Sequence, residues 1–170
     1  MSTSVDEVLQ NIDTNRCVGV EIHNKSMRYI LTEPVTYSYS GRVSNPPPPT
    51  IGQGEKGVCV FIKTPYTACG TVGVLTYKFG NTQISLLVSN PYDYAKYSIE
   101  YALYVPDRFV ATDENLYNQM YTELPESPSF TKTALGKGNA ALTITKGGIF
   151  VSATMSNEKK AILKIDFRDA

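Results

Sequence analysis

The sequence predicts an all-β fold, a β-sandwich of about ten strands flanked by two short helices, in a single domain spanning residues 1–170. Most of the chain consists of short apolar runs separated by turn-forming residues such as Gly, Pro, Asn and Ser. In residues 160–167 the apolar side chains recur at every second position, which is the period of a strand with one buried face. About ten such runs at close spacing are typical of a sandwich or barrel.

Residues 1–15 are expected to form a short helical segment before the first strand. Ser4 can cap the helix, and Glu7 follows three residues later, as in a capping box. The apolar side chains that come next share the spacing i, i+3, i+4 and i+7 and form one stripe, which should dock on the sandwich. They are Val5, Val8, Leu9 and Ile12.

From Arg16 onward the hydrophobic period changes to that of strands. Tight turns are expected at residues 146–148 and 156–158, because Gly, Ser and Asn favour the backbone angles of hairpin turns. These turns separate the last three predicted strands. The full set of predicted strands is 16–22, 27–31, 35–40, 57–63, 70–78, 83–89, 98–105, 140–146, 148–155 and 160–167.

One segment interrupts the strand pattern and predicts the second helix. In residues 113–124 the apolar pair Leu116 and Met120 lies four positions apart, so both side chains face one side of a helix. Two acidic residues open the segment, where they interact favourably with the helix dipole, and Pro125 ends it.

Composition and charge narrow the class of protein. Sixteen Lys and Arg residues balance sixteen Asp and Glu residues, so no field of one sign steers the chain to nucleic acid or to an anionic membrane. No apolar run is long enough to cross a bilayer. With a single histidine, no catalytic triad, phosphate-binding loop or metal-ligand cluster is evident. We therefore expect neither enzymatic activity nor a cofactor or metal.

The three cysteines cannot all pair within the chain. A hairpin turning near Pro65 would place Cys59 opposite Val72, out of register for a bridge to Cys69. Free thiols favour a reducing compartment, and no secretory signal is visible at the N-terminus. The expected location is therefore the cytosol, or the outside of the cell after release without a signal peptide, with peripheral association with membranes.

Tyrosine is the main functional signal in this sequence. The chain has twelve tyrosines and no tryptophan, and one cluster occupies about thirty residues. The face of an aromatic ring attracts quaternary ammonium groups such as the choline head of a lipid, while the hydroxyl bonds polar groups. Any one of these rings, taken singly, is also compatible with packing in the core of a β protein. The cluster consists of Tyr92, Tyr94, Tyr97, Tyr101, Tyr104, Tyr117 and Tyr121.

Two motifs within this cluster occur in a specific order. Pro91 is followed by Tyr-Asp-Tyr and then by Tyr97, and about twenty residues later Tyr117 and Tyr121 lie four apart on the second predicted helix. In this order the sequence resembles the actinoporin family, the pore-forming cytolysins of sea anemones, and above all the actinoporin-like proteins of fishes. The resemblance runs from about Arg16 to Phe167 and includes Val18–Val20, Ser40–Gly41, Gly70–Tyr77 and Ala161–Ile165.

The resemblance implies an actinoporin-like β-sandwich that carries a phosphocholine pocket, which recognises sphingomyelin in the toxins. In such a site aromatic faces surround the trimethylammonium group, and serine and tyrosine hydroxyls bond the phosphate. A choline head is a zwitterion, so the site needs no net basic charge. Carried over to this chain, the pocket consists of Ser40, Val72, Ser89, Pro91, Tyr97, Tyr117 and Tyr121.

The sequence departs from the toxins around the pocket. Lys96 replaces an exposed aromatic, and Glu100 and Tyr101 stand where the toxins carry tryptophans that enter the bilayer. This weakens anchoring, because Trp and Tyr favour the membrane interface and Lys and Glu do not. Thr122 stands where the family usually has a further pocket tyrosine. We assign Tyr94, Lys96 and Tyr101 to a membrane-contact loop.

The N-terminal segment departs further. The toxins have a longer amphipathic leader that becomes the pore wall, whereas about fifteen residues precede the first predicted strand here. A helix needs roughly 20 residues to cross the hydrocarbon core, and Asp6, Glu7 and Asp13 would be costly to place in lipid. We therefore expect pore formation to be weak or lost.

The favoured hypothesis is a peripheral membrane protein that recognises phosphocholine headgroups of the sphingomyelin type and that could self-associate on membranes. Two alternatives stay open at this point. The first is an active pore-forming cytolysin. The second is a sandwich that binds a soluble glycan or protein, because a fold alone does not decide function. The altered segment from Lys96 to Tyr101 favours the alternative of a soluble glycan or protein ligand to the extent that it prevents bilayer contact.

Overall fold

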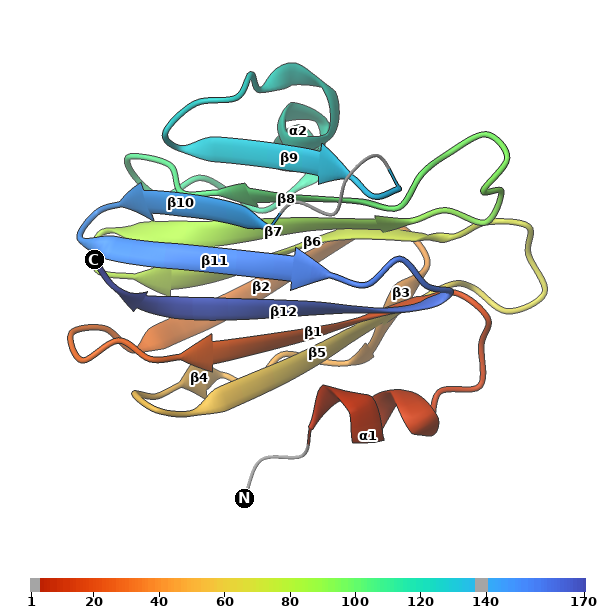
Figure 1. The fold of residues 1–170 in the computed structure, drawn as a ribbon, viewed down its shortest axis with the longest axis horizontal. Coiled ribbons are helices and arrows are strands. Elements are labelled where there is room, and N and C mark those ends of the chain that lie inside the picture. The colour runs from red at the N-terminus through yellow and green to blue at the C-terminus, as the bar shows by residue number, and fades with distance from the viewer. Residues whose placement is uncertain (1–3, 137–140) are drawn as a thin grey trace.

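The computed structural model describes residues 4–136 and 141–170 and shows two β-sheets stacked face to face (Figure 1). The predicted all-β sandwich is confirmed, with twelve strands among the described residues in place of about ten. Sheet A contains, in spatial order, β10 (Leu142–Lys146), β11 (Ile149–Met155), β12 (Lys160–Asp169), β1 (Cys17–Asn24), β5 (Lys56–Ile62) and β3 (Arg42–Asn45). Sheet B contains β4 (Thr50–Ile51), β2 (Leu31–Ser40), β6 (Thr71–Phe79), β7 (Thr82–Asn90), β8 (Glu100–Tyr104) and β9 (Phe130–Ala134).

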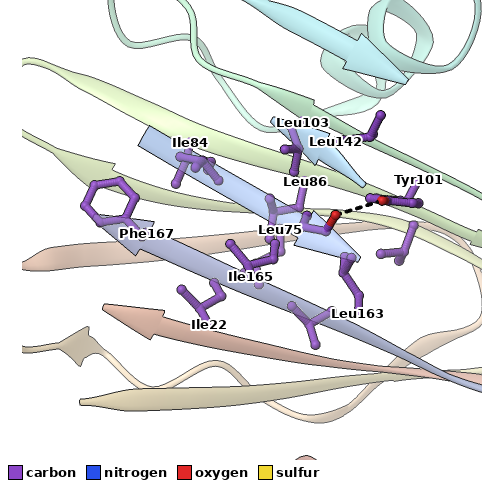
Figure 2. Packing of buried hydrophobic residues seen from close by; sticks show 14 of the residues in the cluster. Ile22, Leu75, Ile84, Leu86, Tyr101, Leu103, Leu142, Leu163, Ile165 and Phe167 are labelled. Carbon is purple, nitrogen blue, oxygen red and sulfur yellow. Dashed lines mark hydrogen bonds between the residues drawn. The ribbon is translucent and has the colours of Figure 1, made fainter. Parts of the chain in front are cut away.

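The two sheets meet along the apolar faces of their central strands. From sheet A, Leu163 and Phe167 of β12 are fully buried, as the alternation in that segment predicts. From sheet B, Leu75 and Leu86 point into the same layer, and Figure 2 shows these side chains together. Burying each such side chain stabilises the fold by roughly 1.5–3 kcal/mol, so this layer dominates the stability of the sandwich.

Strand β1 lies in the middle of sheet A and pairs with β5 on one side and with β12 on the other. It pairs antiparallel with β5, so that Val20 lies opposite Cys59. On its other side it pairs in parallel with β12, and there Val20 lies opposite Leu163. The N-terminal and C-terminal strands are therefore direct neighbours in the sheet.

Helix α1 (Val5–Gln10) packs on the outer face of sheet A, as predicted. Ser4 caps it, because its hydroxyl accepts a hydrogen bond from the backbone amide of Glu7 at 3.2 Å. Val5 and Leu9 are buried against the sheet. Their neighbours in this cluster are Cys17, Val60 and Ile62. Within the described residues no helix is both long and apolar enough to traverse a lipid bilayer.

Helix α2 (Glu114–Asn118) covers the outer face of sheet B beside β9 (Figure 1). The Asp113 carboxylate caps it by accepting from the Leu116 amide at 3.0 Å, which confirms the predicted helix start. The helix continues into a π-helical turn, η1 (Gln119–Glu123). The sequence did not predict this wider turn. Leu116 and Met120 are buried against the sheet, as their spacing indicates.

The structure corrects the predicted strand 27–31. Residues 25–30 form a loop, and β2 begins only at Leu31. The hydroxyl of Ser26 organises this loop by accepting from the amides of Arg28 and Tyr29, each at 3.0 Å, and by donating to the Asp169 carboxylate at 2.6 Å. A side chain that takes over backbone hydrogen bonds in this way competes with the strand ladder. The short strands β3, β4 and β9 were not predicted.

The two strands on either side of Pro65 do not form the hairpin on which the argument about Cys59 and Cys69 was conditional. β5 belongs to sheet A and β6 to sheet B, so residues 63–70 cross from one sheet to the other. The three cysteines are free. Burial raises the pKa of Cys17 to about 11, although Lys160 opposes the shift, and burial raises that of Cys59 to about 12. Both thiols therefore stay protonated and unreactive at neutral pH, whereas Cys69 is exposed.

Candidate functional site

Neighbouring strands of sheet B place several predicted pocket residues in one row. Ser40 of β2 lies opposite Val72 of β6, and Val72 lies opposite Ser89 of β7. The row continues on β8, where Glu100 lies opposite Ser89. Residues that lie directly opposite each other project from the same face of a sheet. The four side chains therefore share the outer face of sheet B, although they are far apart in the sequence.

Helix α2 and the η1 turn bring two tyrosine rings to this row. Tyr117 and Tyr121 lie one turn apart, and their ring centroids are 5.5 Å from each other at an interplanar angle of 27°. Tyr39 of β2 stacks on Tyr117, with centroids 4.5 Å apart and an angle of 15°. Such stacking fixes the ring orientations and adds about 0.5–1.5 kcal/mol per pair. Three aromatic rings are thereby held beside the serine hydroxyls.

A cavity of about 420 Å³ opens at this place, a size typical of small-molecule sites. The structure brings all seven of the residues predicted for the phosphocholine pocket to the wall of this one cavity, which we call the tyrosine pocket. Its full lining is Tyr39, Ser40, Ala68, Cys69, Gly70, Val72, Ser89, Pro91, Tyr92, Asp93, Tyr97, Tyr117 and Tyr121.

The tyrosines of the pocket differ in their exposure. Tyr97 is 59% exposed and lies at the rim. Tyr117 is only 6% exposed, so its ring forms a wall and also packs against the apolar residues beneath α2. Tyr121 is partly buried. Of these three rings, that of Tyr97 is therefore the most open to solvent.

Residues 91–99 form the loop between β7 and β8 that carries Tyr97, and Asp93 shapes it. The Asp93 carbonyl accepts from the amides of Lys96 and Tyr97 at 3.2 and 3.0 Å. Its carboxylate accepts from the Ala95 amide at 2.9 Å, which is the geometry of an Asx turn. This explains why an aspartate stands between the two tyrosines of the motif, and it places Tyr97 back over the pocket.

Arg16 holds the first half of the same loop through hydrogen bonds and ring contacts. Its guanidinium donates to the carbonyls of Pro91, Tyr92 and Asn15 at 3.0, 2.8 and 2.7 Å. The rings of Tyr92 and Tyr94 pack on it, with centroids 5.1 and 4.4 Å from its Cζ atom. Arg16 is only 6% exposed, so these contacts form largely out of water and are stronger for it.

Asn90 ties the end of β7 to sheet A. Its side-chain nitrogen donates to the carbonyls of Cys17 and Lys159 at 3.0 and 2.8 Å. Its side-chain oxygen accepts from the Tyr94 hydroxyl at 2.7 Å. Because Asn90 is fully buried, these bonds lock the loop to both sheets. The pocket is therefore built on a rigid base.

An ion pair lies behind Tyr121. Lys132 Nζ is 3.7 Å from the Glu100 carboxylate and 4.4 Å from the centroid of the Tyr121 ring. Burial, followed by the negative charge of Glu100, raises the pKa of Tyr121. Burial, together with neighbouring groups, also raises the pKa of Tyr117 well above its usual value. Both hydroxyls are therefore neutral donors at physiological pH.

The assignment of a membrane-contact loop needs one correction. Tyr94 is 41% exposed and Lys96 is exposed, as a contact loop requires. Tyr101 is fully buried, because it lies within β8 opposite Val88 and points into the core between the sheets. Its hydroxyl donates to the Ala153 carbonyl at 3.0 Å, the bond drawn in Figure 2. Tyr101 is therefore a core residue and cannot contact a membrane.

Sequence reasoning missed Tyr39, which stacks directly on Tyr117. Strict alternation in residues 35–40 would place Tyr39 and Ser40 on opposite faces of the sheet. The register of β2 against β6 shifts between Ser38 and Ser40, and both Tyr39 and Ser40 line the pocket. Such an irregularity redirects a side chain and leaves little signal in the sequence. The contributions of Ala68, Cys69 and Gly70 were also missed, because the crossover of residues 63–70 from one sheet to the other has no local signal in the sequence.

The fold and the site together define a β-sandwich with two flanking helices and an aromatic pocket at one end. The chain belongs to the sea anemone cytotoxic protein family, the actinoporins, whose family description matches residues 2–167. A comparison with curated proteins finds no match.

Solved structures with the same fold include two that are distant in sequence. The lipid-binding protein Nakanori aligns with a TM-score of 0.71 at 16% identity, over 96% of this chain and 76% of that one. The RahU protein, solved in complex with a TRIS molecule, aligns with a TM-score of 0.51 at 10% identity, over 93% of this chain and 98% of that one. At these identities the likeness concerns the fold.

Proposed function

We propose that this protein is a peripheral membrane protein that binds phosphocholine headgroups, as in sphingomyelin, in the tyrosine pocket. The observation that carries the proposal is the stack of Tyr39, Tyr117 and Tyr121, which faces the same cavity as Tyr97. Several aromatic faces around one space are the arrangement that binds a quaternary ammonium group. Family membership and the lipid binding of Nakanori support a membrane lipid as the ligand.

The charges near the pocket support a zwitterionic headgroup. Glu100, beside Tyr121, is paired with Lys132 at 3.7 Å, so the two charges offset each other next to the pocket, and the protein as a whole has no net charge. The Ser40 hydroxyl already donates to the Gly70 carbonyl at 3.1 Å. We therefore assign the phosphate oxygens to the hydroxyls of Ser89, Tyr97 and Tyr117, which line the cavity.

Vesicle co-sedimentation tests the proposal directly. We expect the protein to sediment with vesicles that contain sphingomyelin, and to do so far less with vesicles in which an anionic lipid without choline replaces it. Soluble phosphocholine should release the bound protein by competition for the pocket. Equal sedimentation with both kinds of vesicle, unaffected by phosphocholine, would show that the pocket is not a choline site.

We further propose that binding is accompanied by little or no pore formation. Val5 and Leu9 hold α1 against sheet A at 0% and 4% exposure, and helix α1 also carries Asp6 and Glu7. Moving this segment into lipid would expose its docking surface and bury two carboxylates. The loop next to the pocket presents Lys96 to the membrane, which does not favour insertion.

We therefore expect sphingomyelin vesicles loaded with a self-quenching dye to release little of it when the protein binds. Deletion of residues 1–14 should lower thermal stability more than vesicle binding, because α1 contributes packing to sheet A. Strong dye release by the intact chain, lost on this deletion, would instead establish an active pore-forming cytolysin.

A further inference from the structure

The crossover loop of residues 63–70 projects from the same end of the sandwich as the 91–99 loop that carries Tyr97 (Figure 1). Its last residues, Ala68, Cys69 and Gly70, line the tyrosine pocket. The Thr67 hydroxyl donates to the Thr64 carbonyl at 2.7 Å and closes the turn at the loop tip. Two loops therefore flank the mouth of the pocket on the same side of the molecule.

Tyr66 at the tip of this loop is placed unusually. It is fully exposed, with a relative exposure of 105%, so its ring gains no packing in the protein. Its backbone has φ of +62°, a left-handed conformation that favours glycine or asparagine. A tyrosine here costs about 1 kcal/mol or more in backbone strain. Neither packing nor backbone preference accounts for a tyrosine at this position, which indicates that its ring contacts a binding partner of the protein.

The charge of the loop indicates what Tyr66 contacts. Residues 64–69 contain no charged side chain, whereas the 91–99 loop contains Asp93 and Lys96. Lys63 at the loop base is only 5% exposed; its amine donates to the Thr64 carbonyl at 3.1 Å and lies 5.5 Å from the centroid of the Tyr92 ring. An uncharged tip that ends in an aromatic ring is suited to the interfacial zone of a bilayer, where Tyr accumulates.

We propose that Tyr66 anchors the protein at the membrane interface while the tyrosine pocket holds a lipid headgroup. The proposal rests on the proposed function, since it takes the membrane as the partner. A membrane, and not a protein, is the assigned partner because the loop tip is continuous with the pocket wall at residues 68–70. In this arrangement Tyr66 supplies an aromatic contact that the 91–99 loop lacks at Lys96.

The test compares Tyr66→Gly and Tyr66→Asn with Tyr66→Trp. Glycine and asparagine accept the left-handed backbone, so both variants should fold and keep or raise the melting temperature. We expect both to bind sphingomyelin vesicles roughly tenfold more weakly, because the buried ring area is lost. Tyr66→Trp should bind at least as tightly as the original chain. The affinity for soluble phosphocholine, measured by calorimetry, should be the same in all of them.

Phe109→Ala provides the matched control. Phe109 is an aromatic residue at 46% exposure in the loop after β8, which lies at the opposite end of the sandwich, and its loss should leave vesicle binding unchanged. Wild-type vesicle affinity in Tyr66→Gly would overturn the anchor and leave the pocket intact. An equal loss of phosphocholine and vesicle affinity would also overturn it, since the loop would then act through the pocket. If the original chain binds neither probe, the proposed function itself fails.

Discussion

Replacing Arg16 with methionine is expected to lower the free energy of unfolding by about 3 kcal/mol. The substitution keeps the apolar stem but leaves the carbonyls of Asn15, Pro91 and Tyr92 without their donor. A buried polar group that loses its partner costs roughly 1–3 kcal/mol, and two ring contacts are lost as well. Urea unfolding followed by circular dichroism measures the change. Vesicle binding should weaken too, because the loop that carries Tyr97 loses its support.

Two further substitutions control this prediction. Arg16→Lys should recover only part of the stability, because an ammonium group cannot reach three carbonyls in the planar geometry of a guanidinium. Arg108→Met removes an exposed arginine at the other end of the sandwich and should change the free energy of unfolding by less than about 0.5 kcal/mol. A similar small change for Arg16→Met would mean that the contacts of Arg16 do not hold the loop in place.

Tyr97→Ala is expected to weaken binding to sphingomyelin vesicles by about 1 kcal/mol or more, the size of one cation–π contact in a partly desolvated site. Tyr97 is 59% exposed, so the fold should survive with little change in stability. Tyr117→Ala should weaken binding at least as much. It should also destabilise the fold by roughly 2–4 kcal/mol, because the ring is 6% exposed and its removal leaves a cavity.

Comparing Tyr97→Ala with Tyr117→Ala separates the contribution of the tyrosines to lipid binding from their contribution to stability. Sedimentation with sphingomyelin vesicles gives the binding change, and thermal unfolding gives the stability change for the same preparations. Phe109→Ala should leave vesicle binding unchanged, since it lies away from the pocket. Unchanged vesicle binding by a folded Tyr97→Ala protein would argue that the choline group is not held at this rim.

Most of the fold could be predicted because its signals are local. Ser4 and Asp113 cap the two helices as their sequence positions indicate, and the alternation in β12 is nearly perfect. The errors arise where a distant contact overrides the local pattern. The loop around Ser26 depends on Asp169 at the other end of the chain, and the pairing of β5 with β1 cannot be read from β5 itself.

The site illustrates the same limit. The seven residues carried over from the family resemblance lie around one cavity. The register of β2, β6 and β7 aligns Ser40, Val72 and Ser89 on neighbouring strands. Tyr101 was misplaced because an alternating strand begins at Glu100, which turns the next side chain into the core. Tyr39 was missed because a register shift is a property of two paired strands. The Tyr66 conformation likewise has no signature in composition.

The parallel pairing of β1 with β12 affects the order in which the chain can fold. During synthesis β1 emerges early and can pair with β5, but its other edge must wait for nearly the whole chain. Closing so long a loop is entropically costly and slows folding. Until then the backbone N–H and C=O groups along this edge of β1, an apolar strand, have no partner strand, and unpaired edges of this kind promote aggregation. Among the strands of the described residues, the one synthesised last is thus the partner that completes the one synthesised first.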